Sequence, residues 1–316
     1  MTVDVVVVGA GVSGLTTAVC LLEAGAAVSV RTAGAPIGTT SAVAGAMIGP
    51  VAAAEDDAQR AWSAASDRKF RELADDPAAG VAVRRGRLLT TSGYGAALPP
   101  WAAEVPGFAP LTAEHLPAGF LAGLRAELPF VDMPVYLSWL MGRVRALGGE
   151  VRWQAVSAWS EVAGDGEVVV NCAGLGAADL AGDRDLVPVL GQHVIVDCPS
   201  LDEFVYEGGA PTDWLSVMPH GRRVVLGGVA RRGTFGLTPD PEITAAILAR
   251  ARAAIPALLN SPVIGVEVGL RPGRPTPRVE VEPVEGIRVV HNYGHAGNGV
   301  TLSWGCAADA ARLALT

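Results

Sequence analysis

The hydrophobic positions near the N-terminus change from a continuous run to a helical spacing. Val5–Val8 is an unbroken apolar run, which is typical of a strand that is buried on both faces. The apolar residues that follow have the i, i+3, i+4, i+7 spacing of one helix face: Leu15, Ala18, Val19 and Leu22. Gly25 stands where such a helix should end, and Ala27–Val30 is then the second strand. The pattern predicts a strand, a helix and a second strand.

The rest of the chain continues to alternate between strand and helix patterns. Apolar runs predict strands at 81–91, 168–173, 187–197, 214–229, 263–270 and 287–292. Helical spacing predicts helices at 56–74, 134–147, 241–254 and 300–313. The stretch 98–134 is rich in proline, which favours turns and irregular crossing between domains.

The order of these elements indicates an α/β fold that is not cut into two consecutive domains. The continuous run at 168–173 has the character of a parallel strand, whereas 187–197 and 214–229 are typical of antiparallel strands. We therefore expect a parallel sheet that begins at the N-terminus and is completed late in the chain, with an antiparallel domain inserted between its parts. A length of 316 residues is compatible with one or two domains.

The net charge and the hydropathy pattern argue against some classes of binding partner. The net charge of −8 and the pI of about 5.2 argue against nucleic acid or an anionic membrane surface as the main partner. The longest uncharged run, 32–54, contains Pro36, Pro50 and many small residues, so it predicts a loop or a cofactor wall and not a membrane span. No charged segment precedes the first apolar run, so we expect no signal peptide.

The cysteines and their spacing give no sign of a metal site. Cys20, Cys172, Cys198 and Cys306 lie far apart, without a C-x-x-C pair or a nearby histidine at zinc-ligand spacing. Buried, reduced thiols are the simplest interpretation, and they predict a cytoplasmic protein.

The first helix is preceded by the glycine pattern G-x-G-x-x-G. Gly9 suits a tight turn, Gly11 lets the backbone approach a pyrophosphate, and Gly14 lets the helix pack on the strand. Phosphates would then lie at the helix N-terminus, where unpaired N–H groups favour an anion. The acid expected near residues 31–33 for a ribose hydroxyl is missing, and Arg31 could instead bind a 2′-phosphate. The motif alone leaves FAD, NAD and NADP open.

Two stretches near the C-terminus carry a more specific pattern. Residues 269–275 read GLRPGRP, and residues 291–305 read HNYGHAGNGVTLSWG. Together with the segments 39–46, 136–140 and 170–174, they resemble the D-amino acid oxidase family of FAD flavoproteins. The resemblance covers most of the chain except roughly 75–130 and 198–213.

The resemblance implies a Rossmann-like FAD-binding domain with an interleaved antiparallel-sheet substrate domain. The segments 1–50, 136–185 and 262–316 would form the FAD-binding domain, and 51–135 and 186–261 the substrate domain. The implied FAD-binding residues are Gly9, Ala10, Gly11, Val12, Ser13, Gly14, Arg31, Thr39, Thr40, Ser41, Gly45, Ala46, Met47, Val156, Ala173, Gly174, His295, Ala296, Gly297, Asn298, Gly299, Val300 and Thr301. Thr301 is expected to begin the last helix, with the positive end of that helix facing the flavin.

Arg271 and Gly297 are the predicted catalytic residues. We expect Arg271 at a strand end, where the following proline holds the backbone extended and the guanidinium could grip a carboxylate. A structural salt bridge is the alternative for a single arginine. The resemblance implies that Arg271 binds the substrate carboxylate and that the Gly297 carbonyl faces the substrate amine. It further implies hydride transfer from a D-amino acid to flavin N5, giving a 2-oxo acid, ammonia and, with molecular oxygen, hydrogen peroxide.

The histidines suggest no metal pair. His291 and His295 are four residues apart, but Asn292 and Gly294 between them disfavour a helix face, so we interpret both as organising a loop, with His295 near the flavin. The remaining histidines carry no pattern and are predicted to be ordinary surface or turn residues: His115, His193 and His220.

The sequence departs from the family where substrate specificity is set. Thr212 and Ser216 stand where family members usually carry tyrosines over the pocket, so either Tyr206 or Trp214 replaces that lid or the pocket is more open. Without an extra Arg or Lys in this region, neutral D-amino acids are favoured. A glycine, sarcosine or D-aspartate type oxidase, a catalytically silent flavin-binding module and, from Arg31 alone, an NADP-dependent dehydrogenase are the alternatives, and a homodimer is left open.

Overall fold

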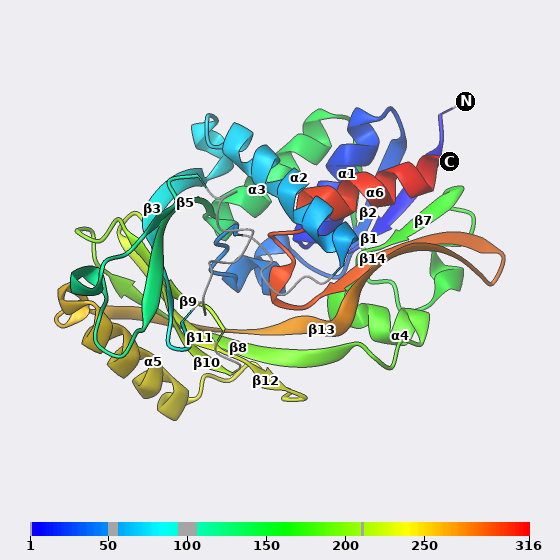
Figure 1. The fold of residues 1–316 in the computed structure, drawn as a ribbon. Helices are drawn as coiled ribbons and strands as arrows, with labels where there is room; N and C mark the ends of the chain where they lie inside the picture. The colour runs from blue at the N-terminus through cyan, green and yellow to red at the C-terminus, as the bar shows by residue number, and fades with distance from the viewer. Residues whose placement is uncertain (1, 50–55, 94–105, 210–211) are drawn as a thin grey trace.

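One large mixed sheet runs through the molecule (Figure 1), and a computed structural model describes it over residues 2–49, 56–93, 106–209 and 212–316. The predicted boundary at residues 50 and 51, and the beginning of the proline-rich stretch, lie outside these residues. Within them the sheet has fourteen strands in the order β4-β5-β3-β9-β10-β11-β8-β13-β14-β7-β1-β2-β6, and β12 pairs with β8.

The strands and helices have the following bounds. The strands are β1 Asp4–Val8, β2 Ala27–Thr32, β3 Val81–Thr90, β4 Ala109–Pro110, β5 Ala122–Val131, β6 Glu150–Trp153, β7 Val168–Asn171, β8 Val187–Asp197, β9 Phe204–Glu207, β10 Asp213–His220, β11 Arg223–Val229, β12 Arg231–Arg232, β13 Val263–Val284 and β14 Ile287–His295. The helices are α1 Val12–Glu23, α2 Asp57–Leu73, α3 Met133–Ala146, α4 Ala177–Ala181, α5 Pro241–Ala254 and α6 Ser303–Leu315.

The sheet has a parallel part and an antiparallel part, as the order of elements predicted. Strands β14, β7, β1, β2 and β6 are parallel neighbours, and Val5 of β1 pairs with Val168 on one side and Val28 on the other. Strands β9, β10, β11 and β8 pair in antiparallel fashion. The prediction of an α/β fold with an inserted antiparallel sheet is confirmed.

The long strand β13 joins the two parts, and its length differs from the prediction. We expected a strand that ends at Leu270, but β13 continues to Val284 and crosses the molecule in Figure 1. Its first half pairs with β8, with Arg271 opposite Val189, and its second half pairs with β14. Arg271 therefore lies inside a strand. The prolines near Arg271 lie where β13 stops pairing with β8 and begins to pair with β14. Because few strand–strand hydrogen bonds form at this point, the N–H groups that proline lacks cost the sheet little. The domain boundaries remain a prediction.

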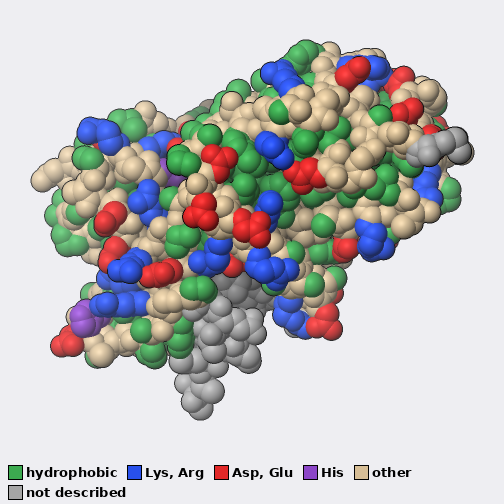
Figure 2. Space-filling view, turned by 90° about the horizontal axis from the view of Figure 1, so that it is seen from above, with side chains coloured by type: hydrophobic (Ala, Val, Ile, Leu, Met, Phe, Trp, Pro, Cys, Tyr) green, Lys and Arg blue, Asp and Glu red, His purple; other side chains and the backbone are tan. Residues whose placement is uncertain are grey.

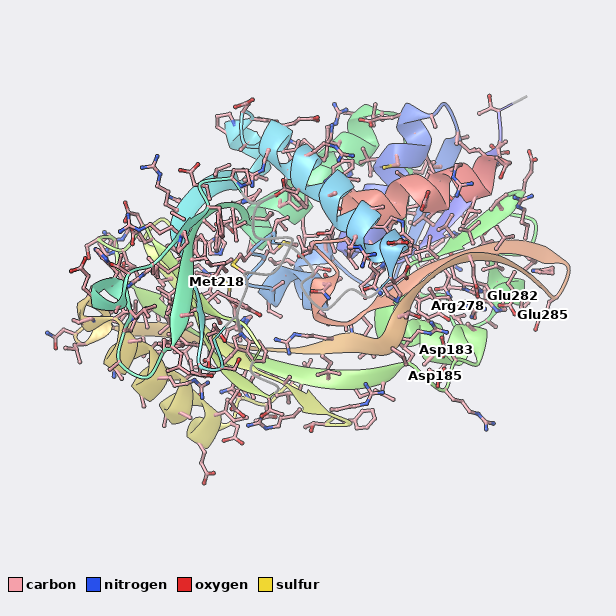
Figure 3. The ribbon with its side chains drawn as sticks, in the orientation of Figure 1. Asp183, Asp185, Met218, Arg278, Glu282 and Glu285 are labelled. Carbon is pink, nitrogen blue, oxygen red and sulfur yellow. The ribbon has the colours of Figure 1, made fainter. Side chains whose placement is uncertain are left out.

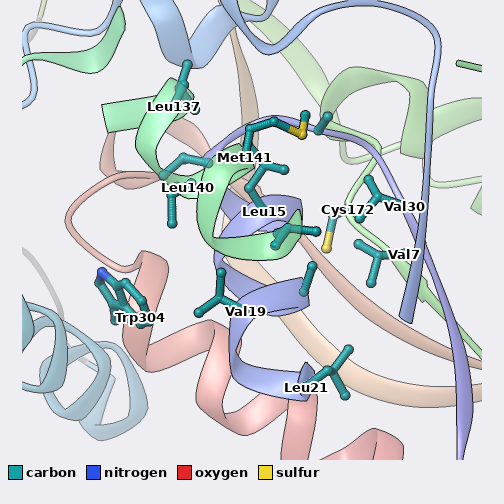
Figure 4. Packing of buried hydrophobic residues seen from close by; sticks show 14 of the residues in the cluster. Val7, Leu15, Val19, Leu21, Val30, Leu137, Leu140, Met141, Cys172 and Trp304 are labelled. Carbon is teal, nitrogen blue, oxygen red and sulfur yellow. The ribbon is translucent and has the colours of Figure 1, made fainter. Parts of the chain in front are cut away.

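The helices above the parallel strands enclose the main hydrophobic core (Figure 4). Helix α1 is buried between this part of the sheet and helices α3 and α6, and Leu15 and Val19 are almost fully enclosed. The indole of Trp304 on α6 donates a hydrogen bond of 2.9 Å to the Tyr136 hydroxyl on α3. These contacts fix the N-terminus of α1 against the ends of the parallel strands, where ligands bind in open α/β sheets.

The predicted turns and irregular crossing at 98–134 are wrong for part of this stretch. Strand β5 occupies ten of its residues and pairs with β3 along its whole length, from Val131 opposite Val81 to Ala122 opposite Thr90. The backbone partner lies more than thirty residues earlier in the chain, so tertiary pairing overrides the local signal of the prolines. The last helix also begins later than predicted, at Ser303, because short turns occupy residues 296–302.

The outer surface carries charges of both signs. Figure 2 shows Lys or Arg and Asp or Glu side chains interspersed over the face seen from above, with no large field of one sign. Among the helices of the described residues, none is both long and apolar enough to cross a membrane.

Candidate active site

A cavity of about 1090 Å³ lies where the parallel and antiparallel parts of the sheet meet. It is lined by every predicted FAD-binding residue except Gly14, and by both predicted catalytic residues. Their roles remain predictions, but the structure brings them together from the two ends of the chain, from Gly9 to Thr301. The cavity is also lined by residues outside the predicted set, several of which belong to strands β8, β9 and β10.

One end of the cavity is formed by the glycine turn before α1. Gly11 is the N-cap of this helix and makes no side-chain cap, and no acidic residue occupies the first turn. A Cβ at Gly14 would overlap the carbonyl oxygen of Gly9, which explains why Gly14 contacts the protein and not the cavity. Only the Val12 N–H is engaged by a side chain, the Ser41 hydroxyl at 3.0 Å. This end therefore presents the donors and the positive dipole that suit a pyrophosphate.

Arg31 lines the cavity, but its charge is already matched. The side chain is buried and donates hydrogen bonds to the carboxylate of Asp165 and the side-chain oxygen of Gln154. A guanidinium held in this way has less need of a 2′-phosphate as its counter-charge. The NADP alternative rested on Arg31 alone, so the structure removes its basis.

The other end of the cavity is formed by two strained segments. Ala46 and Ala296 line it with φ angles of 50° and 49°, in the left-handed region that is rare for residues other than glycine. Such strain is typical of backbone that is held for binding or catalysis. Between them lies the buried His295, whose Nε2 has no hydrogen-bond partner among the described residues. This wall of exposed backbone and one unpaired polar atom fits a flat, hydrogen-bonding ring such as a flavin.

Arg271 supplies a cation without a counter-charge. It donates hydrogen bonds to the carbonyl oxygens of Leu190 at 3.3 Å and Val229 at 3.0 Å, and its Cζ lies 6.0 Å from the centre of the Trp214 ring. No Asp or Glu in the described residues forms an ion pair with it. Burial lowers the pKa of Arg271, but a guanidinium stays protonated at neutral pH. The alternative of a structural salt bridge finds no partner here.

Gly297 lies beside Arg271. A Cβ built on Gly297 would be 3.7 Å from Cδ of Arg271, so the two residues that the resemblance marks as catalytic adjoin each other. A Cβ at Gly191 would overlap the guanidinium, so only glycine leaves room for Arg271 at that position of β8. The part of the cavity next to the guanidinium can therefore hold an anion.

His193 corrects the prediction that it is an ordinary surface or turn residue. Its side chain is buried in the cavity wall, and Nδ1 donates a hydrogen bond to the Val43 carbonyl at 2.9 Å. Burial, with a smaller effect from Arg271, lowers its pKa to about 4, so the ring is neutral at pH 7. The two-residue period of β8 could have indicated this position, because it places Gly191 and His193 on the same face of the strand.

The other histidines take separate positions. His220 also departs from the prediction, because it is largely enclosed and its Nε2 donates to the Gly45 carbonyl at 3.1 Å. His115 is exposed, as predicted. The prediction that His291 and His295 organise a loop is wrong, because both lie in strand β14. His291 is fully buried there, and its Nε2 lies 2.9 Å from a carboxylate oxygen of Glu282. No group of three or more His, Cys, Asp or Glu in the described part of the chain is arranged to hold a metal ion.

A network of ion pairs and hydrogen bonds surrounds the end of β14 that leads into the cavity. Figure 3 shows Asp183, Arg278 and Glu282 close together near α4 and β14, while Met218 lies toward the antiparallel part of the sheet. Arg278 pairs with Glu282 at 2.9 Å, and the Tyr293 hydroxyl donates to Asp183 at 2.8 Å. Arg278 also donates to the Tyr293 hydroxyl at 2.9 Å, and Arg274 of β13 pairs with Asp183 at 2.9 Å. These bonds tie β13 and β14 to each other and to the segment that follows α4.

The buried histidines predict an acid-sensitive fold. Burial lowers the pKa of His193, His220 and His295 from the ordinary value of 6.5 to about 4. Between these values the unfolded chain binds protons that the folded chain does not, so stability should fall as the pH is lowered from about 6.5 to 4. Thermal unfolding at a series of pH values measures this dependence.

A pair of variants separates this effect from general acid sensitivity. His220→Gln keeps a donor for the Gly45 carbonyl and removes one titrating ring, so the fall of Tm with acidification should become shallower. His115→Gln, at an exposed position, is the matched control. An unchanged slope in His220→Gln would show that burial of this ring does not set the acid sensitivity.

Together, the strand-glycine-helix unit, the long cavity and the unpaired arginine define a dinucleotide-binding site that faces an anion-binding pocket, as in flavin-dependent oxidoreductases. Residues 4–313 match the family described as FAD dependent oxidoreductase, and the chain belongs to this family.

Individual relatives agree with this assignment. The chain is 42% identical to a D-amino-acid oxidase of Rubrobacter xylanophilus over 98% of this chain and 95% of the relative. It is 41% identical to a D-amino-acid oxidase of Streptomyces coelicolor, over 98% and 96%, and 33% identical to a human D-aspartate oxidase, over 99% and 94%. Among solved structures, a glycine oxidase from Bacillus cereus aligns with a TM-score of 0.80 at 21% identity, over 99% of this chain and 95% of that chain. This last match shows the fold alone.

Proposed function

We propose that this protein is an FAD-dependent oxidase of D-amino acids. The observation that carries the proposal is Arg271, a partly buried cation that lines the cavity without an acidic partner in the described residues and adjoins Gly297. An α-carboxylate is an anion of suitable shape for a guanidinium, because two parallel N–H···O bonds can form. The relatives named D-amino-acid oxidase, at 41–42% identity over nearly the whole chain, support the same substrate class.

The cavity fits FAD at both of its ends. The N–H groups of Gly11 and Ser13 would hold the pyrophosphate, and the strained backbone around Ala46 and Ala296, with His295, would hold the ring. When bound, FAD supplies the hydride acceptor for the substrate α-carbon and passes the electrons to molecular oxygen, which yields hydrogen peroxide.

The residues of the chain contribute position more than acid–base chemistry. Arg271 fixes the substrate carboxylate, and the Gly297 carbonyl accepts a hydrogen bond from the substrate amine. With the carboxylate and the amine held, the α-hydrogen and the side chain are the two remaining substituents, and the configuration at the α-carbon decides which of them would be presented to the hydride acceptor. Such orientation is worth several orders of magnitude in rate. His193 is neutral beside Arg271, so the site holds one positive charge for the carboxylate. The imino acid that leaves the site hydrolyses in water to a 2-oxo acid and ammonia.

The cellular compartment and the choice among related oxidases rest on less direct observations. The four cysteines are free in the structure, which supports a reducing compartment such as the cytoplasm. The intact Arg271 and Gly297 speak against a catalytically silent flavin-binding module. A glycine or sarcosine type oxidase shares the carboxylate grip and is distinguished by its substrates.

Product analysis with matched enantiomers tests the proposal. FAD-loaded protein is incubated in air with D- or L-alanine, D- or L-methionine, glycine, sarcosine or D-aspartate, and peroxide and 2-oxo acid are measured. We expect both products in equal amounts from D-alanine and D-methionine, and neither from the L forms. Turnover confined to L-amino acids, or to glycine and sarcosine, would overturn the assignment.

A further inference from the structure

Two carboxylates line the described wall of the cavity, and they differ in their partners. Glu267 pairs with Arg223 at 3.1 Å, so its charge is matched. Glu207, the last residue of β9, has no Arg, Lys or His partner among the described residues. Its Oε2 accepts a hydrogen bond of 2.8 Å from the Leu215 backbone N–H, and the second oxygen is left for another donor. A partly buried anion is thus held in a fixed place without a cation.

Glu207 and Arg271 line the same cavity, beside the aromatic residues Tyr206 and Trp214. The Trp214 ring centre is 6.0 Å from Cζ of Arg271, and Trp214 directly precedes Leu215, whose N–H holds Glu207. Tyr206, the neighbour of Glu207, also lines the cavity. Burial raises the pKa of Tyr206, Arg271 lowers it and Glu207 raises it, so the phenol lies within electrostatic reach of both charges. The cation and the anion therefore both lie near Tyr206 and Trp214.

We propose that Glu207 is a specificity-determining residue that binds the side-chain cation of a basic D-amino acid, such as D-lysine or D-arginine, whose carboxylate lies on Arg271. This inference rests on the proposed function. The aliphatic stem of such a side chain suits the faces of Tyr206 and Trp214, and its charged end can donate to the free carboxylate oxygen. The same carboxylate repels an acidic side chain, so it acts against D-aspartate and D-glutamate.

This inference changes the expectation drawn from the sequence. Neutral substrates were favoured because the lid region offers no extra Arg or Lys, and that absence still argues against acidic substrates. The sequence gives no sign that Glu207 lines the cavity, because its place depends on the pairing of β9 with β10, where the Leu215 N–H donates to its carboxylate. With that pairing in place, the pocket gains an anion and its preference extends to cationic side chains.

A charge-neutral variant separates recognition from a structural role. Glu207→Gln keeps a side-chain oxygen for the Leu215 N–H and removes the charge. For this variant we expect kcat/KM to fall by about 10- to 100-fold with D-lysine, as for loss of a hydrogen bond to a charged group. With D-norleucine, which has nearly the same stem without the ammonium, kcat/KM should stay within about threefold. Glu203→Gln, at an exposed position just before β9, is the matched control.

Each other outcome contradicts the inference in a distinct way. An equal loss with D-lysine and D-norleucine would mean that Glu207 only supports β10, and an unchanged value with D-lysine would mean that the carboxylate does not contact the substrate. A second variant, Glu207→Lys, should improve the ratio of D-glutamate to D-lysine turnover, and failure to do so in a folded, FAD-loaded protein would also count against it. If the unaltered protein oxidises D-alanine but not D-lysine, the present inference fails alone, whereas oxidation of no D-amino acid would mean that the proposed function fails.

Discussion

Replacing Arg271 by alanine is expected to lower kcat/KM for D-amino acids by two to three orders of magnitude while FAD remains bound. The guanidinium is partly buried, held by the Leu190 and Val229 carbonyls and free of an acidic partner in the described residues, so the substrate carboxylate is its natural counter-charge. Removing one partner of a buried, hydrogen-bonded charge pair costs roughly 2–5 kcal/mol. Steady-state kinetics give the loss, and the flavin absorbance of the purified variant reports cofactor content.

Two further variants make this result specific. Arg271→Lys keeps the charge but loses the two-pronged geometry, so it should recover only part of the efficiency. Arg232→Ala removes an exposed arginine of β12 and should leave kinetics unchanged. Near-normal efficiency in Arg271→Ala would remove the carboxylate role of this residue. A loss of FAD together with activity would point to a structural role instead.

Replacing Gly14 by alanine is expected to destabilise the protein and to abolish tight FAD binding. The added Cβ would overlap the Gly9 carbonyl oxygen and lie 3.3 Å from the Cβ of Cys172, so α1 must move away from the strand end. The movement displaces the Gly11 and Val12 N–H groups that face the cavity. Overpacking of this kind lowers the free energy of unfolding by about 1–3 kcal/mol. Here the added Cβ meets a backbone carbonyl, which can move less than a side chain. Thermal unfolding with and without FAD measures both effects.

Gly142 offers the matched control on a neighbouring helix. A Cβ at this exposed position of α3 meets no atom within 4 Å, so Gly142→Ala should raise stability by about 0.5–1 kcal/mol through the better helix propensity of alanine. It should leave FAD binding unchanged. If Gly14→Ala unfolded at the same temperature as the unaltered protein and bound FAD equally well, the close packing of the glycine turn would not be required.

The parts of the fold that the sequence predicted well are those set by local pattern. Strand β8 and helix α5 have the predicted bounds, and the strand-glycine-helix unit is confirmed. The segment 263–270 was predicted too short, because β13 is extended by its pairing with β14 and not by its own hydrophobic pattern. Likewise, β5 forms against β3 in spite of its prolines.

The residues of the candidate site also divide into those that a local motif marks and those that depend on tertiary pairing. The cofactor residues and Arg271 belong to contiguous motifs that a resemblance can mark, and the structure gathers all of them except Gly14 around one cavity. His193 and Glu207 were missed because nothing in their neighbours along the chain is distinctive. Their orientation follows from strand registers that join residues far apart in sequence, such as Gly191 opposite Gly269. Specificity is therefore the part of the function that depended most on the structure.

Anaerobic mixing of the FAD-loaded protein with matched D- and L-amino acids tests the central claim most directly, because it reports reduction of the flavin without any later step. We predict that D-amino acids bleach the flavin absorbance and that their L enantiomers leave it unchanged. A flavin that no D-amino acid reduces, in protein that is folded and yellow, would contradict the assignment of this site to D-amino acid oxidation.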